Sequence, residues 1–234
     1  MIKILALGNS FSEDSTAYLE KMTEGLYVRN LYIGGCSLER HSNNLDNEAK
    51  EYVFEEHAKR HPDFPENVSA NEIFASEKWD YITVQQASPY SGVVESYEPY
   101  LTNVLGYIKA LCPTAKVVFH QTWAYPKASE SGAFAKYNND QNEMFECIKK
   151  ATKAVEEKHG LALIRVGEMI QALRETDLLD DADYTRDSIH LSFNYGRYIA
   201  AAVWAKFFGK TVNDFLPENA DREVIEKIKA FIFS

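Results

Sequence analysis

Five short, mostly apolar runs constrain the fold more than any other feature of this sequence. They cover residues 2–7, 27–33, 79–84, 116–121 and 161–166. Each run is mostly apolar on both faces, which is typical of parallel strands that are covered by helices on both sides. Stretches of helical period, the clearest between Tyr97 and Leu111, lie between and after the runs. This alternation predicts a three-layer α/β/α sandwich with a five-stranded, mostly parallel sheet.

Residues 41–75 do not follow the alternation. They are polar and mixed and contain Pro62 and Pro65. The segment is long for a connection inside a compact domain. We therefore expect a single domain over residues 1–234, with an inserted lobe or lid around 41–75 that has some helix around 47–57.

The charge balance excludes several classes of partner. The chain has 234 residues, with 25 Lys and Arg against 35 Asp and Glu, which gives a net charge of −10. Binding to nucleic acid or to an anionic membrane requires clustered Lys and Arg, so neither partner is expected. No apolar run approaches the ~20 residues that span a bilayer. The first residues carry no signal-peptide pattern, which predicts a cytoplasmic protein, although a chain trimmed of its signal would look the same.

The cysteines and histidines do not indicate a metal site. Three cysteines without C-x-x-C spacing form neither a disulfide framework nor a zinc cage. His57 and His61 are four residues apart and could share a helix face. A zinc-protease motif, however, needs Glu directly after the first His, and Ala58 stands there. We therefore expect no metal.

The first candidate for chemistry is a serine that follows the first predicted strand. Gly8 and Asn9 precede Ser10, and acidic residues suited to a helix start follow it. In open α/β sheets, ligands bind beyond the carboxyl ends of the strands, where Ser10 would stand. Backbone N–H groups at a strand-to-helix junction can also stabilise an oxyanion. The alternative is that Ser10 or Ser12 only caps the helix.

The second candidate is the sequence Asp-x-x-His near the C-terminus, formed by Asp187 and His190. A nucleophilic serine needs a general base, and that base needs a carboxylate that orients it. An Asp three residues before a His can accept the Nδ1 proton within one turn and leave Nε2 free. Because the pattern is short, it can also be an ordinary surface loop with a capping Asp.

Two further strand ends carry residues suited to an oxyanion site. Gly34 and Gly35 follow the second predicted strand, and paired glycines allow a close approach of backbone to ligand. Gln85 and Gln86 end the third, where a side-chain amide could donate to an oxyanion. Alternatively, the glycines form a simple turn and the glutamines make local turn bonds.

Taken together, the four patterns resemble the SGNH, or GDSL, hydrolase superfamily in their order along the chain. The phrases around Ser10, Gln86 and His190 also resemble a bacterial subgroup of unknown function, DUF4886. The resemblance implies a flavodoxin-like SGNH hydrolase fold and a catalytic triad of Ser10, His190 and Asp187. It also implies an oxyanion hole built by Ser10 and Gly35, with no metal or organic cofactor.

The sequence departs from the family in two of its blocks. Gly-Asn-Ser replaces the usual Gly-Asp-Ser, which keeps the serine, and the third block lacks its Gly-x-Asn-Asp. Gln86 is the expected substitute for the missing Asn by its position at the strand end. Gln85 remains open, because a slip of one residue reverses which side chain faces the site.

The resemblance implies a serine esterase that hydrolyses a short-chain acyl ester, with acetyl groups on a carbohydrate as the first candidate. A non-catalytic glycan- or ligand-binding domain with a degenerate oxyanion hole is the alternative. Trp123 and Tyr125 follow the fourth predicted strand and could wall an acyl or sugar pocket, or could equally be core aromatics. The expected partner is therefore a small-molecule or carbohydrate ester, and the oligomeric state stays open.

Overall fold

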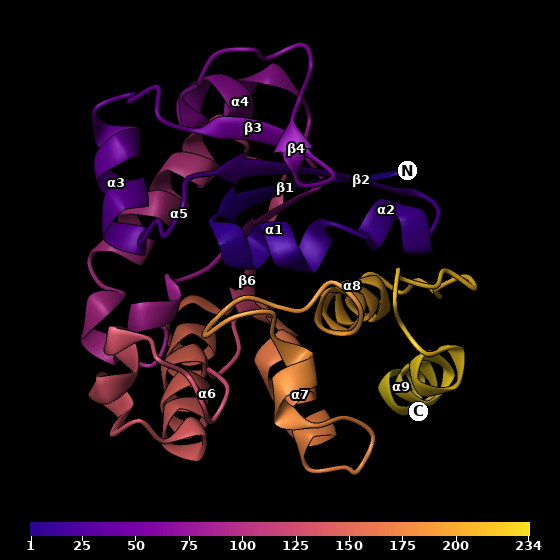
Figure 1. The fold of residues 1–234 in the computed structure, drawn as a ribbon. Coiled ribbons are helices and arrows are strands. Elements are labelled where there is room, and N and C mark those ends of the chain that lie inside the picture. The colour runs from indigo at the N-terminus through magenta and orange to yellow at the C-terminus, as the bar shows by residue number, and fades with distance from the viewer.

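A computed structural model describes all 234 residues, and one seven-stranded sheet forms its centre (Figure 1). The strands are β1 (Ile2–Gly8), β2 (Leu26–Tyr32), β3 (Val53–Glu56), β4 (Lys59–Arg60), β5 (Tyr81–Val84), β6 (Lys116–Gln121) and β7 (Ala162–Arg165). Their order across the sheet is β4-β3-β2-β1-β5-β6-β7. The five predicted strands are confirmed, and they pair in parallel.

The helices connect the strands and cover both faces of the sheet. They are α1 (Ser10–Thr16), α2 (Leu19–Met22), α3 (Leu38–Asp46), α4 (Ala70–Ser76), α5 (Tyr100–Leu111), α6 (Gln141–His159), α7 (Val166–Arg174), α8 (Gly196–Phe207) and α9 (Arg222–Phe233). Short 3-10 turns are η1 (Ser88–Tyr90), η2 (Val94–Ser96), η3 (Gly132–Tyr137) and η4 (Asp181–Tyr184). No helix is long and apolar enough to cross a membrane.

The predicted strand count was too low because residues 41–75 contribute to the sheet. β3 and β4 form an antiparallel hairpin that extends the sheet beyond β2. His57 and Ala58 make its two-residue turn, both with positive φ, as a type I′ turn requires. The helix expected around 47–57 is therefore wrong, since the helices of this segment are α3 before the hairpin and α4 after it.

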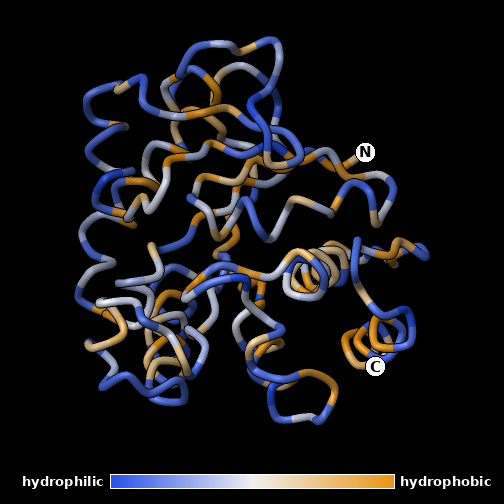
Figure 2. The backbone as a smooth tube through the Cα atoms, in the orientation of Figure 1, coloured by the Kyte–Doolittle hydropathy of each residue, from blue (hydrophilic) through white to orange (hydrophobic).

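The sheet separates two apolar cores. Along β1, Ile4 and Ala6 belong to one core and Leu5 and Leu7 to the other, as the two-residue period of a strand requires. Helices α1, α2, α7, α8 and α9 contribute to the first core, α3, α4 and α5 to the second, and α6 to both. Figure 2 shows polar residues along the outer loops, while apolar stretches run through the strands. The three-layer architecture predicted from the sequence is confirmed.

Candidate active site

Ser10 is the first residue of α1 and directly follows the turn at the end of β1. Asn9 caps the helix, because its Oδ1 accepts the N–H of Phe11 at 3.0 Å. Gly8 is required by close packing, since a Cβ there would lie 2.4 Å from Ser12 Oγ. The turn leaves Ser10 half-buried, with its side chain available at the carboxyl end of the sheet.

The loop before α8 brings His190 and Asp187 to Ser10. Ser10 Oγ lies 2.9 Å from His190 Nε2, and His190 Nδ1 lies 2.9 Å from Asp187 Oδ2. The other carboxylate oxygen of Asp187 accepts the backbone N–H groups of Ile189 and His190 at 2.8 and 2.7 Å. The three residues thus form one continuous chain of hydrogen bonds, with the geometry expected of a nucleophile, a base and an orienting carboxylate.

The pKa of Asp187 is lower than that of an ordinary aspartate. Burial alone would raise this pKa, but hydrogen bonds from the backbone of His190 and Ile189 and from the His190 imidazole outweigh it. The carboxylate therefore stays ionised beside the imidazole, where it can fix the tautomer and stabilise a positive charge on the ring.

A buried carboxylate that the sequence did not reveal anchors the His190 loop to the Ser10 helix. Asp14 is fully buried, and both of its oxygens accept Arg186 Nη1 at 2.9 Å. Arg197 Nε donates to Asp14 at 2.8 Å, and the backbone N–H of Leu191 donates at 2.9 Å. Asp14 lies one helical turn after Ser10, so this network fixes the nucleophile and base segments relative to each other.

Two backbone N–H groups, one in the Ser10 turn and one in the neighbouring loop, make no hydrogen bond within the protein. They belong to Ser10 itself, at the N-terminus of α1, and to Gly35 in the loop after β2. Gly35 is exposed and has a φ of +64°, a conformation that favours glycine. The loop lies against the Ser10 turn, because Asn9 Nδ2 donates to the Cys36 carbonyl at 3.0 Å. These N–H groups are free to bind an oxygen ligand.

Comparison with known proteins places the chain in a family. A model of the family described as "Domain of unknown function (DUF4886)" matches residues 3–230. The chain belongs to the DUF4886 family. A crystal structure of a DUF4886 family protein from Bacteroides uniformis is 33% identical to this chain, with a TM-score of 0.86 and coverage of 99% of this chain and 93% of the other.

More distant solved structures share the fold of this DUF4886 protein. A proposed SGNH hydrolase from Slackia heliotrinireducens is 22% identical, with a TM-score of 0.63 and coverage of 89% and 99% of the two chains. An acetylxylan esterase from Geobacillus stearothermophilus is 12% identical, with a TM-score of 0.58 and coverage of 89% and 94%. The fold is thus that of the SGNH hydrolases. Among curated proteins, no sequence matches this chain.

The structure corrects the role expected of Gln86 in this DUF4886 protein. Gln86 Nε2 donates to both the carbonyl and the hydroxyl oxygen of Ser96, each at 3.0 Å. Its Oε1 accepts the N–H groups of Leu38 and Ala87 at 3.0 and 2.8 Å. The amide protons are therefore used inside the protein, and Gln86 ties loops together instead of donating to an oxyanion.

Trp123 and Tyr125 are core residues and do not wall a pocket in this DUF4886 structure. Both side chains are fully buried. Trp123 stacks on Phe11 with ring centroids 4.1 Å apart, and its Nε1 donates to the Ile189 carbonyl at 2.9 Å. Tyr125 shares a hydrogen bond of 2.9 Å with Ser88. Trp123 thus holds the Ile189 backbone, next to His190, through a hydrogen bond from the core.

His57 and His61 do not share a helix face in the DUF4886 fold, because they lie at the β3–β4 hairpin. His57 Nδ1 lies 3.3 Å from Glu20, and His61 Nε2 lies 3.8 Å from Glu56. Each imidazole therefore faces a different carboxylate. The cysteines are free thiols, and burial raises the pKa of Cys36 to about 12, which leaves it protonated and unreactive.

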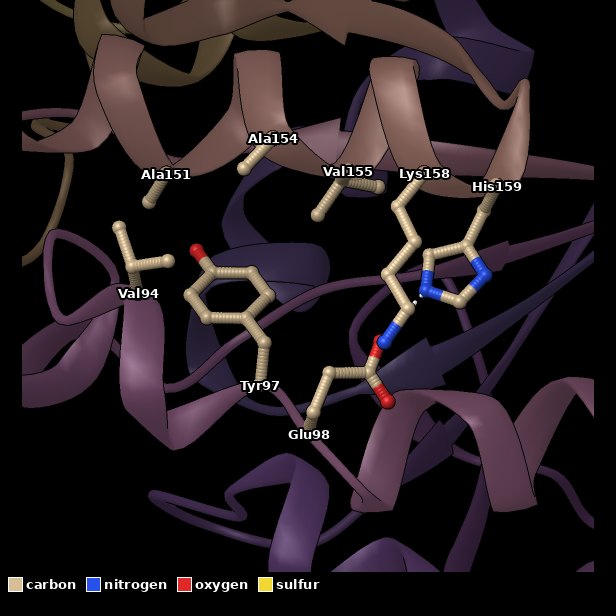
Figure 3. Close-up of a pocket in the computed structure, with 8 residues that line it drawn as sticks. All are labelled: Val94, Tyr97, Glu98, Ala151, Ala154, Val155, Lys158 and His159. Atoms are coloured by element: carbon tan, nitrogen blue, oxygen red, sulfur yellow. Dashed lines mark hydrogen bonds and ion pairs between the residues drawn. The ribbon is translucent and has the colours of Figure 1, made fainter.

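Two hollows of this DUF4886 protein differ in their relation to Asp187. One of about 390 Å³ includes Asp187 in its lining but neither Ser10 nor His190, and is lined by Pro126, Ala128, Glu130, Ala182, Thr185, Arg186, Asp187 and Ser188. The other, an apolar crevice between α6 and η2, is shown in Figure 3. Its lining includes no residue of the triad. Its acidic group, Glu98, is already paired with His159 at 2.5 Å and Lys158 at 3.1 Å.

Proposed function

We propose that this protein is a serine esterase that cleaves a short-chain acyl ester through an acyl-enzyme. The hydrogen-bonded chain from Ser10 through His190 to Asp187, with 2.9 Å at both links, carries the proposal. Ser10 Oγ attacks the ester carbonyl carbon while His190 Nε2 takes the hydroxyl proton. His190 then protonates the departing alkoxide, and Asp187 stabilises the charged imidazole. A water molecule, deprotonated by His190, releases the acyl group as a carboxylic acid.

The backbone N–H groups of Ser10 and Gly35 hold the oxyanion in this mechanism. Neither donates within the protein, so both can bind the carbonyl oxygen as negative charge develops on it. The start of α1 contributes the positive end of its peptide dipoles at the same point. The mechanism therefore needs no side-chain amide in the place of the family's Asn.

The polar hollow beside Asp187 supports a hydroxyl-rich alcohol as the leaving group. Thr185, Ser188, Glu130 and Arg186 offer donors and acceptors along its walls. The acetylxylan esterase among the structures of similar fold points in the same direction by analogy. We therefore place acetylated carbohydrates first among candidate substrates.

Replacing the nucleophile tests the reaction class. Ser10→Ala should abolish hydrolysis of p-nitrophenyl acetate, with a loss of ~10³-fold or more in kcat. The wild type should take one fluorophosphonate group on Ser10, located by peptide mass spectrometry, and the variant none. Ser76→Ala, at the distant end of α4, is the matched control and should retain both properties.

Two results would contradict the proposal. Wild-type activity in Ser10→Ala would exclude Ser10 as the nucleophile. A wild type that neither reacts with fluorophosphonate nor hydrolyses esters, yet binds acetylated oligosaccharides, would instead establish the non-catalytic binding domain.

A further inference from the structure

A chain of four buried polar side chains runs beneath the Ser10 turn. Gln85 Nε2 lies 2.8 Å from Asn9 Oδ1, and Gln85 Oε1 lies 2.7 Å from His120 Nδ1. His120 Nε2 in turn lies 3.2 Å from Ser15 Oγ. All four side chains are at most 1% exposed. Asn9 and Gln85 directly follow β1 and β5, while His120 lies in β6 and Ser15 in α1, so the four side chains connect these elements next to the Ser10 turn.

The directions of the hydrogen bonds from Asn9 through Gln85 to His120 Nδ1 follow from one backbone group. Asn9 Oδ1 accepts the N–H of Phe11, so Asn9 Nδ2 must face the Cys36 carbonyl. Gln85 must then offer Nε2 to Asn9 Oδ1, which turns Gln85 Oε1 toward His120. Since an oxygen acceptor faces Nδ1, this ring nitrogen must carry the proton.

The surroundings of His120 agree with a fixed neutral tautomer. Burial lowers its pKa to about 3, so the ring carries a single proton near neutral pH. With that proton on Nδ1, Nε2 can only accept, and the one proton of the Ser15 hydroxyl is shared between Nε2 at 3.2 Å and the Phe11 carbonyl at 2.9 Å. The ring packs edge-on against Trp204, with centroids 5.3 Å apart, which prevents it from turning freely.

We propose that Gln85 and His120 are positioning residues that fix the Asn9 side chain and, through it, the spacing between Ser10 and the Gly35 loop. This inference rests on the proposed function, because that spacing places two oxyanion donors. Asn9 connects the two segments, because its Oδ1 caps the Ser10 helix and its Nδ2 donates to the Cys36 carbonyl, next to Gly35. If Gln85 is removed, Asn9 Oδ1 loses one of its two donors and is held only by the Phe11 N–H, so the Asn9 side chain is fixed less firmly toward Cys36.

The loss should appear in kcat, because the oxyanion contacts strengthen only as the transition state forms. Gln85→Leu and His120→Leu should each lower kcat for p-nitrophenyl acetate by about 10- to 100-fold with little change in KM, as expected for a small misplacement of reacting groups. His120→Asn is the matched rescue, because an Asn amide can donate from the place of Nδ1. It should keep kcat within about threefold of the wild type, a margin of well under 1 kcal/mol.

Nitrogen NMR supplies a readout that does not depend on activity. In the wild type, the His120 ring should show the Nδ1–H tautomer, identified by the signals that disappear in His120→Asn. The backbone amide signal of Gly35 should shift in both Leu variants and return toward its wild-type position in His120→Asn.

An Nε2–H tautomer would overturn the inference. So would Leu variants that unfold at lower temperature but keep the wild-type kcat and the wild-type Gly35 signal, because Gln85 and His120 would then only stabilise the core. If the wild type shows no esterase activity and no fluorophosphonate labelling, the proposed function fails. The positioning of the Gly35 loop is then decided by the tautomer and the Gly35 signal alone.

Discussion

Replacement of Asp14 by Asn should lower both the free energy of unfolding and the kcat of the proposed reaction. The Asp14 carboxylate is fully buried and accepts hydrogen bonds from Arg186, Arg197 and the Leu191 backbone at 2.8 to 2.9 Å. An Asn amide would present an N–H group to one of these donors. Arg186 would lose its counter-charge, and Arg197 would keep only the carboxylate of Glu13, at 3.3 Å. Breaking a buried ion pair in this way costs ~3–5 kcal/mol.

The lower end of that range applies, because the arginine side chains keep some contact with water. Their exposed fractions are 25% for Arg186 and 12% for Arg197. We therefore expect Asp14→Asn to lower the free energy of unfolding by ~3 kcal/mol, out of the ~5–15 kcal/mol that is typical of a folded protein. The variant should still fold near room temperature, where its activity can be measured.

The assay combines urea unfolding with steady-state kinetics well below the unfolding transition. Under these folding conditions the kcat of Asp14→Asn should fall by about tenfold or more, because Arg186 and Leu191 flank the segment that carries Asp187 and His190. Glu223→Gln, which removes one carboxylate from an exposed ion pair with Lys227, should change neither quantity measurably. An Asp14→Asn protein with wild-type unfolding free energy refutes the energetic argument. A destabilised variant with wild-type kcat refutes the positioning role.

Three further predictions concern the triad, pH and substrate binding. Because the lowered pKa of Asp187 keeps its carboxylate ionised beside the imidazole, Asp187→Asn should remove this charge and lower kcat, and an Asp187→Asn protein with the wild-type kcat contradicts this role. Burial, followed by the charge of Glu13, raises the pKa of Glu55 to about 8 from an ordinary 4.5. The folded state therefore favours the protonated acid. The contribution of Glu55 to the free energy of unfolding should be greatest below pH ~4.5. It should fall by at most roughly 5 kcal/mol as the pH rises to about 8 and then level off. Urea titrations should show this slope in the wild type and its loss in Glu55→Gln; an equal slope in both excludes Glu55 as the source. Glu130→Ala, on the wall of the polar hollow, should raise KM for an acetylated xylo-oligosaccharide but not for p-nitrophenyl acetate, and an equal effect on both would remove the hollow from the substrate site.

The strands of the sheet were predictable where burial on both faces requires a continuous apolar run in the sequence. Strands covered on both faces must be apolar on both faces, so the five central strands were found to within one or two residues of their observed ends. The β3–β4 hairpin lacks this signal. Its strands are short and mixed, and its turn places His57 and Ala58 at positive φ without the Asn or Gly that normally marks such a turn.

The site was predictable only as far as strand ends and local motifs describe it. The place of Ser10 after β1 and the spacing of Asp187 and His190 also allowed a helix cap and an ordinary loop, and the resemblance to the SGNH hydrolases assigned the triad. The structure brings the three side chains together. Asp14 gave no signal, because an acidic residue in the first turns of a helix is ordinary and its partner Arg186 stands 172 residues away in sequence. The burial of Trp123 depends on Phe11, which reaches it from another element of the fold.

The two glutamines after β5 show that an amide at the position of the family's third-block Asn does not by itself take over the role of that Asn. Both carry amides at the expected strand end, but Gln85 is needed to hold Asn9, and Gln86 is needed to hold Leu38 and Ser96. An amide that is already bound on every side cannot follow a developing charge. The donors left for an oxyanion are then backbone N–H groups, whose placement depends on how Asn9 joins the Ser10 helix to the Gly35 loop. In this chain Asn9 Nδ2 donates to the Cys36 carbonyl next to Gly35, a hydrogen bond that an ionised Asp in the first block could not make.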